Sequence, residues 1–117
     1  MPPPRPLRLY YTGWSSSTGE ADWGLRPLFA GDKTPPSMYN ISYYKNPTVD
    51  ADIMKALGTT DRAEKTKLYT EVQEEIWKDA PWAFLVTEKL LYATSKKLTG
   101  MYVMPDANYF FEEIDLQ

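Results

Sequence analysis

The strongest constraint on the fold is a pair of capped helices that the sequence predicts near the middle of the chain. The segment "NPTVDADIMKAL" offers Asn46 as an N-cap and Pro47 at the first helical position, where a missing N–H costs nothing. The segment "TTDRAEKTKLYTEVQEEIWKDAP" opens with Asp61 and Glu64 in capping-box spacing, and Pro81 stops it. We therefore expect two consecutive helices with well-defined starts.

Apolar residues recur at helical spacing in both segments, so each helix should bury one face. The charged residues of the second helix occupy its other sides, which is typical of a solvated face. Gly58 ends the apolar run of the first helix. The residues that we expect in the core are Val49, Ile53, Leu57, Leu68, Tyr69, Val72, Ile76, Trp77 and Trp82.

Short β segments flank the two helices. Residues 7–12 precede them, and "WAFLVT" and "LLYAT" follow them, in runs of strand length and composition. Two more, "MYVMP" and "FFEEIDL", come after a turn expected over residues 96–100. Helices between β segments predict an α/β fold, with the two central helices packed on short strands. The final β segments are too few for a full sheet, so we expect a part of a larger protein.

The remaining segments read as loops. Residues 30–47 are punctuated by Gly31, Pro35, Pro36 and Pro47, while residues 25–29 form at most a short helical turn. Four residues should pin the long loop to the rest of the chain, namely Tyr39, Ile41, Tyr43 and Tyr44. The Pro-rich start, residues 1–6, should be an extended leader, and it lacks the apolar region of a signal peptide.

Composition excludes several classes of function. The 117 residues include no His and no Cys, which removes imidazole bases, thiolate nucleophiles, disulfides and the usual zinc ligands. We therefore expect no catalytic residue, no metal site and no cofactor. A net charge of −3 without a basic cluster argues against nucleic acid. No apolar run is long enough to span a membrane.

An unusually polar loop is the strongest candidate for function. Residues 13–24 contain "SSSTGEADW", and Trp14 and Trp23 frame its serines and carboxylates. Trp combines apolar area with an N–H donor, so it suits a ligand-facing surface as well as a core. The pattern fits either an ordinary surface loop or the rim of a binding site.

The order of these segments resembles the C-terminal part of the solute-binding proteins that serve peptide-type ABC importers. The matching segments are the strand ending in "GW", the "SSSTGEADW" loop, "YYKNPTVDADIMKAL", "TTDRAEKTKLYTEVQEEIWKDAPW", the "KKLTG" turn and "FFEEIDL". Together they extend over about residues 8–117. The serine-rich loop is most similar to the glutathione-binding subgroup of this family.

The resemblance implies a two-lobed, class II periplasmic-binding-protein-like parent that closes on its ligand. Residues 7–80 would then form the end of the second lobe. Residues 81–117 would cross the hinge and return toward the first lobe. The parent would be extracytoplasmic or periplasmic, and its partners would be a small peptide or glutathione-like ligand and a membrane permease.

The resemblance also implies roles for single residues. A strand ending in Gly-Trp pairs with the ligand backbone in this family. Di- and oligopeptide binders usually have an Asp three residues after that Trp, to bind the ligand's α-ammonium group, and the chain has Ser17 there. Serine hydroxyls can instead donate to a carboxylate of glutathione. The implied ligand-binding residues are Tyr11, Thr12, Gly13, Trp14, Ser15, Ser16, Ser17 and Asp22.

Two other functions stay open on the sequence alone. One is an interaction module whose tyrosines form a partner surface. The other is a hydrolase that uses Glu20 and Asp22 as a carboxylate pair. We expect a binding protein that is not an enzyme. We also expect the chain to self-associate, because its β segments would otherwise expose unpaired edges.

Overall fold

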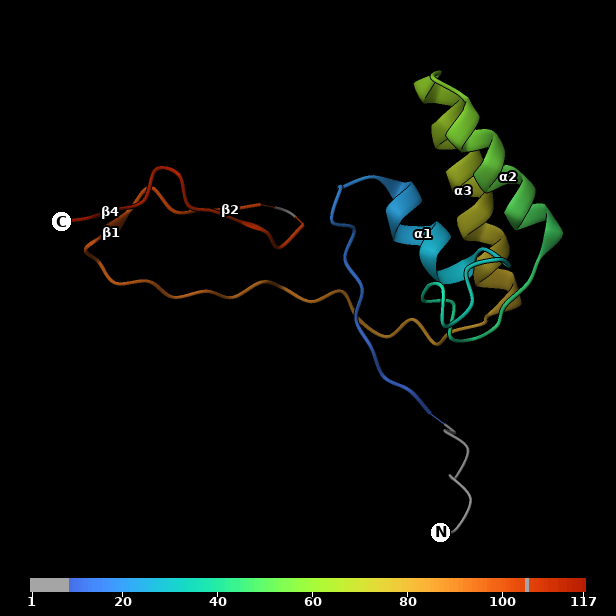
Figure 1. The fold of residues 1–117 in the computed structure, drawn as a ribbon, viewed down its shortest axis with the longest axis horizontal. Coiled ribbons are helices and arrows are strands. Elements are labelled where there is room, and N and C mark those ends of the chain that lie inside the picture. Colours follow the sequence, from blue (N-terminus) through green and yellow to red (C-terminus); the bar gives the residue numbers. More distant parts are fainter. Residues whose placement is uncertain (1–8, 105) are drawn as a thin grey trace, which may run out of the picture.

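A computed structural model describes residues 9–104 and 106–117, and it contains three helices and four short strands (Figure 1). The expected leader over residues 1–6 lies outside the described residues. The helices are α1 (Ala21–Phe29), α2 (Pro47–Gly58) and α3 (Arg62–Asp79). The strands are β1 (Leu98–Thr99), β2 (Tyr102–Val103), β3 (Tyr109–Phe110) and β4 (Asp115–Leu116).

The predicted N-caps of α2 and α3 are confirmed. The Asn46 side chain accepts hydrogen bonds from the backbone N–H groups of Thr48 and Val49, at 2.9 and 3.4 Å. The Asp61 carboxylate likewise accepts from the N–H groups of Ala63 and Glu64, at 2.7 and 3.1 Å. Both caps satisfy backbone donors that have no partner inside the helix.

The capping box at α3 is only half formed. The Glu64 carboxylate accepts a hydrogen bond from the Thr59 hydroxyl at 2.8 Å, whereas a full box would bond it to the Asp61 N–H. The Asp61 N–H instead donates to the Thr59 hydroxyl oxygen at 3.2 Å. At its other end α3 stops at Asp79, because Ala80 adopts a left-handed conformation with φ of 47° before Pro81.

Helix α1 begins earlier than the sequence suggested. The loop expected over residues 13–24 ends at Glu20, and Ala21 is already helical. Asp22 in the first turn lies one helical turn before Arg26, and the two side chains form a bidentate ion pair. This i, i+4 pair stabilises the first helical turn of α1, which was expected to be part of the loop.

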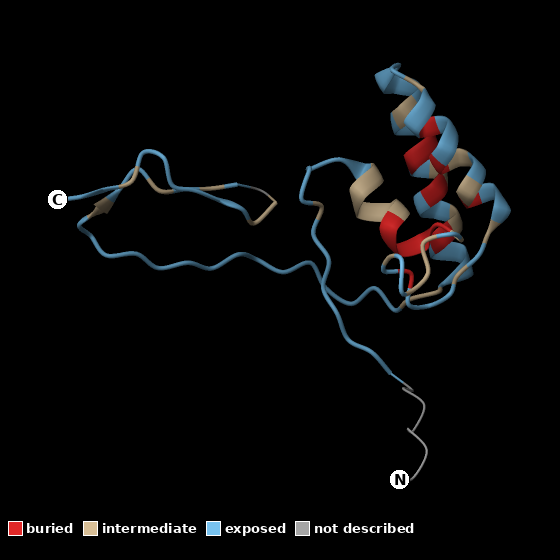
Figure 2. Ribbon diagram, in the orientation of Figure 1, coloured by how far each residue is buried: buried red, intermediate tan, exposed pale blue. Residues whose placement is uncertain are grey.

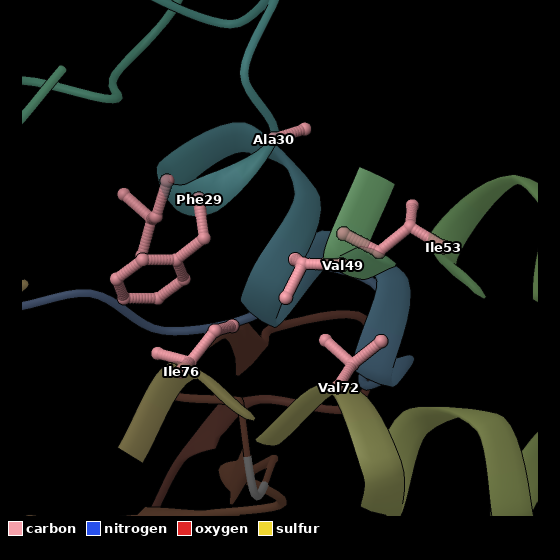
Figure 3. Packing of buried hydrophobic residues seen from close by; sticks show 7 residues of the cluster. Phe29, Ala30, Val49, Ile53, Val72 and Ile76 are labelled. Atoms are coloured by element: carbon pink, nitrogen blue, oxygen red, sulfur yellow. The ribbon is translucent and has the colours of Figure 1, made fainter. Parts of the chain in front are cut away.

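One apolar core joins the three helices, as the red segments in Figure 2 and the close view in Figure 3 show. Leu28, Phe29 and Ala30 come from α1 and its end, and they pack against one face each of α2 and α3. Of the predicted core residues, those confirmed as buried are Val49, Ile53, Leu68, Tyr69, Val72 and Ile76.

Two predicted core positions are wrong. Leu57 is 43% exposed, and Ala56 is buried in its place, because steps of four and then three residues from Val49 keep the stripe on one face. Trp77 is 69% exposed and stacks on Phe84 with ring centroids 5.8 Å apart. Trp82 is half-buried against the core and packs on Phe29.

The expected strands before and directly after the helices do not form in the described residues. Residues 9–12, 82–87 and 90–94 are extended, and most of their side chains are exposed. A strand needs a partner for its backbone groups, and no described segment pairs with them. The predicted packing of the helices on short strands is therefore wrong, since no described helix contacts a described strand.

The strands that do form make a C-terminal arm, defined here as residues 83–117, which extends away from the helices in Figure 1. β1 pairs antiparallel with β4, and β2 pairs antiparallel with β3, so one pair lies beyond the other along the arm. The expected turn over residues 96–100 ends early, because Leu98 and Thr99 form β1. The Cα radius of gyration is 18.6 Å, against about 13 Å for a compact domain of this length.

Gly100 is required where the two strand pairs of the arm meet. Its φ is +75°, and a Cβ atom placed there would lie 1.7 Å from the carbonyl oxygen of Glu113. We expect Gly100→Ala to separate β1 from β4, because the new methyl group and the left-handed backbone are both unfavourable. Amide hydrogen exchange should show lost protection at Gln117, whose N–H donates to the Lys97 carbonyl at 2.9 Å, whereas Gly13→Ala, with nothing within 4 Å, should leave it unchanged. Unchanged protection in Gly100→Ala would contradict this account.

Candidate functional site

Trp14 is held at the edge of the helical bundle by two contacts. Its indole Nε1 donates to the backbone carbonyl of Trp23 at 2.9 Å. Its ring packs on Tyr39 with centroids 5.0 Å apart and planes tilted by 51°. The side chain is still 36% exposed, so it presents apolar area to solvent from a fixed position. An anchored, partly exposed indole can form one wall of a binding site.

The serine loop, residues 13–20, is shaped by two of its three serines. The Ser15 hydroxyl donates to the carbonyl oxygen of Asp106 at 3.0 Å. The Ser16 hydroxyl donates to the carbonyl oxygen of Glu20 at 2.8 Å, and the N–H of Gly19 donates to the Ser16 carbonyl. Gly19 has φ of +69°, which closes the turn before α1.

Ser17 differs from its two neighbours. It is exposed, and its hydroxyl has no hydrogen-bond partner among residues 9–104 and 106–117. It is therefore the member of the serine triplet whose hydroxyl can donate to a ligand without breaking a contact to any described residue. The three serines could not be distinguished from the sequence, whereas the structure gives each hydroxyl a different set of hydrogen bonds.

Asp22 faces α3 within the bundle. Its carboxylate accepts from Arg26 Nε at 2.8 Å and Arg26 Nη2 at 2.7 Å, and from the Tyr69 hydroxyl at 3.4 Å. The Asp22 hydrogen bonds raise the pKa of Arg26. Burial and the nearby Asp22 charge raise the pKa of Tyr69 to about 12. The Asp22 contacts link α1 to α3.

Residues 11–13 run extended into the serine loop and are exposed. The Thr12 hydroxyl donates to the Gly13 carbonyl at 3.3 Å, and no backbone N–H of Tyr11, Thr12 or Gly13 donates to a described residue. Exposed, unpaired backbone of this kind can pair with another extended chain.

Asn40 fixes the loop that supports Trp14, and this residue was not predicted from the sequence. The side chain is fully buried, and its amide nitrogen donates to the carbonyl oxygens of Ala30 and Tyr44, at 3.0 and 2.8 Å. Its amide oxygen accepts from the Tyr44 N–H and from the Ser42 hydroxyl. These bonds hold the segment that presents Tyr39 to Trp14. The only signal in the sequence is one asparagine among the aromatic residues of this loop.

A second cluster closes the same loop onto the end of α3. The Tyr44 hydroxyl and the Asn46 amide nitrogen donate to the Asp79 carboxylate, at 2.6 and 2.8 Å. The Tyr44 hydrogen bond, followed by that of Asn46, lowers the pKa of Asp79. Burial is the main cause that raises the pKa of Tyr44. Tyr44 therefore pins the loop as predicted, whereas Ile41 and Tyr43 are exposed.

An apolar hollow of about 180 Å³ lies between α1, α3 and the start of the C-terminal arm. Its lining includes Leu25, Ile76 and the exposed aromatic pair Trp77 and Phe84. The described residues contain no group of three or more carboxylates that could hold a metal ion. The described helices also lack the length and apolar character that a membrane span requires.

Comparison with known proteins decides the family. The chain is 61% identical over 110 residues to the glutathione-binding protein GsiB of Pectobacterium atrosepticum. The matched residues make up 94% of this chain and 21% of that protein. It is 53% identical over 111 residues to the proteins of the same name in Escherichia coli K12 and Salmonella typhimurium. The chain matches a fragment of a family 5 solute-binding protein.

The similarity to these solute-binding proteins includes both the serine loop and most of the C-terminal arm, because it covers 94% of the chain. The resemblance seen in the sequence is thus confirmed. The chain spans about a fifth of the length of the curated relatives that it matches. No family model matches the chain.

Proposed function

We propose that the chain is a ligand-binding part of a solute-binding protein for a peptide-type ABC importer, with a glutathione-like peptide as its ligand. The observation that carries this proposal is the Ser17 hydroxyl, which bonds to no described residue and lies three residues after the anchored indole of Trp14. The names of its relatives, which are binding proteins for glutathione, support the same ligand class. The proposed activity is binding without catalysis.

The proposed parent is a two-lobed, class II receptor in the periplasm that delivers its ligand to a membrane permease. Residues 7–80 form the end of its second lobe, and residues 81–117 cross the hinge and return toward the first. The exposed backbone of residues 83–94, which makes no described backbone hydrogen bond, supports this division. In the parent, neighbouring strands would satisfy these backbone groups.

Each site residue then has a distinct role. Trp14 forms an apolar wall, and the backbone of Tyr11, Thr12 and Gly13 pairs with the extended ligand. Ser17 donates to a ligand carboxylate. The remaining candidates, Ser15, Ser16 and Asp22, hold the loop and α1 in place through the contacts described above.

Two substitutions test this assignment by NMR titration of the chain with glutathione. Trp14→Ala should weaken binding by about 1–3 kcal/mol, the range for an aromatic anchor in a desolvated site. Ser17→Asp should weaken glutathione binding and favour a dipeptide with a free α-amine, because a carboxylate repels the ligand carboxylate. Ser37→Asp is the matched control, since Ser37 lies in a turn after α1. Equal affinities in all four proteins would contradict the proposal.

We also propose that the isolated chain self-associates through the C-terminal arm. One segment of the arm has no backbone hydrogen-bond partner among the described residues, and it contains Leu85, Val86, Leu91 and Tyr92. Leu91 is 92% exposed. Proteins hide such edges and apolar side chains by pairing them with another chain. Sedimentation at micromolar concentration should give a mass above 13.5 kDa, and Leu91→Lys should shift it toward the monomer. A monomer at all concentrations would exclude self-association.

A further inference from the structure

A long-range hydrogen bond brings the C-terminal arm to the serine loop. The Ser15 hydroxyl and the Asp106 carbonyl oxygen, 91 positions apart in the sequence, are 3.0 Å apart. Figure 1 shows the tip of the arm, beyond β2, beside the segment that leads into α1. The candidate site therefore has a second side, which comes from the turn between β2 and β3.

Hydrogen bonds join the described residues of this turn, which are Met104 and residues 106–108. The Met104 N–H donates to the Asn108 carbonyl at 2.8 Å, and the Ala107 N–H donates to the Met104 carbonyl at 3.0 Å. The Asp106 carboxylate accepts from the Asn108 N–H at 3.1 Å and from the Asn108 side-chain amide at 2.9 Å. These two bonds lower the pKa of Asp106, so the carboxylate is negatively charged at neutral pH.

The Asp106 carboxylate can accept more than these two bonds. An ionised carboxylate has about four acceptor positions, and the described contacts with Asn108 use two of them. It can therefore accept from a ligand ammonium group without losing the bonds that orient it. Such a charge-assisted bond is stronger than one between neutral groups.

The two sides of the site offer complementary chemistry. The serine loop presents the hydroxyl of Ser17, two residues after Ser15, and the arm presents the carboxylate of Asp106, the residue whose carbonyl accepts from Ser15. The γ-linked glutamyl group of glutathione has an ammonium and a carboxylate on one carbon atom. One donor and one anionic acceptor suit the two halves of this zwitterion.

We infer that Asp106 binds the α-ammonium group of the γ-glutamyl end of the ligand, while Ser17 donates to the adjacent carboxylate. This inference rests on the proposed function and extends it. The acidic group for the amine, which di- and oligopeptide binders place on the loop, is here on the C-terminal arm. Asp106 thereby becomes a specificity-determining residue, and Ser15 becomes a positioning residue that holds the arm against the loop.

The test compares two ligands on the full chain by NMR titration. The first is glutathione, and the second is glutaryl-cysteinylglycine, which keeps the carboxylate but lacks the ammonium group. The unmodified chain should bind glutathione about tenfold or more tightly than the analogue, the usual effect of a hydrogen bond to a charged group. Asp106→Asn should reduce this ratio to about one by weakening glutathione alone.

Matched variants separate the possible results. Asp115→Asn changes an exposed carboxylate of the same arm, in β4, and should keep the full preference for glutathione. Asp106→Glu retains the charge and should retain part of the preference, even if Asp106→Asn disturbs the turn. Ser15→Ala should weaken glutathione more than the analogue, because it releases the arm.

Failure of the inference differs from failure of the proposed function. If the unmodified chain binds neither ligand, both are overturned. If it binds glutathione and Asp106→Asn retains the ratio between the two ligands, only the role of Asp106 is overturned. An equal loss of both ligands in Asp106→Asn and Asp106→Glu would also overturn it, since that result indicates a purely structural turn.

Discussion

Phe29→Ala is expected to destabilise the helical bundle by about 3–5 kcal/mol, the range for removing a buried aromatic side chain. Phe29 is 3% exposed and lies where α1, the long loop and the start of the C-terminal arm meet. Its ring is 5.0 Å from Trp82 and 6.1 Å from Phe84, and it meets Tyr44 edge to face at 6.4 Å. Because a small domain has a free energy of unfolding of only about 5–15 kcal/mol, this loss is a large share of it.

Urea unfolding followed by far-ultraviolet circular dichroism measures this effect. The matched control is Met54→Ala, because Met54 is 64% exposed on α2 and its truncation should change the free energy of unfolding by less than about 0.5 kcal/mol. A midpoint for Phe29→Ala close to that of the unmodified chain would show that the core lies elsewhere. The aromatic contacts of Phe29 would then be incidental.

The helices could be predicted from the sequence because their determinants are local. Asn46 and Asp61 satisfy backbone donors two and three residues away, and apolar residues at helical spacing define one buried stripe on each helix. Both signals are fixed by short stretches of sequence. The error at Leu57 arose from extending a spacing of four residues where the stripe turns by three.

The strands were predicted only in part, because a strand depends on a partner that sequence composition does not identify. β2 lies within the predicted segment "MYVMP" and β4 within "FFEEIDL", whereas the strands predicted over "WAFLVT" and "LLYAT" do not form in the described residues. "WAFLVT" has strand composition, yet no described segment offers it a hydrogen-bonding edge. β1 and β4 do pair, although they are separated by 15 residues, because Gly100 allows the Glu113 carbonyl to approach. In both segments the presence or absence of a pairing partner decides whether a strand forms.

The candidate site shows the same limit. The resemblance pointed to the serine loop and to Trp14, but it could not divide the roles of the three serines. That division depends on the bond between Ser15 and Asp106, and on Ser16 bonding within its own turn. The long-range contact also brings Asp106 to the serine loop, a neighbour that no local sequence pattern indicates.

Asn40→Ala is expected to lower the free energy of unfolding by about 3 kcal/mol and to release Trp14 as well. The substitution removes both donors to the carbonyl oxygens of Ala30 and Tyr44, and it removes the acceptor for the Tyr44 N–H. The Ala30 carbonyl keeps its bond from the Lys33 N–H, whereas the Tyr44 N–H and carbonyl oxygen lose their described partners. A buried polar group left without a partner costs about 1–3 kcal/mol. The loop would loosen, so Tyr39 would no longer support the Trp14 ring.

Two measurements on the Asn40 variant separate stability from the loss of site geometry. Urea unfolding gives the change in stability. The NMR signal of the Trp14 indole N–H, which donates to the Trp23 carbonyl in the unmodified chain, reports the position of the ring. Ser42→Ala is the matched control, because it removes a single bond to the Asn40 amide oxygen from an exposed residue. That control should cost about 1 kcal/mol and leave the indole signal in place. An Asn40→Ala variant with an unshifted Trp14 signal would show that the indole is anchored independently of the loop, and the support assigned to Tyr39 would then be wrong.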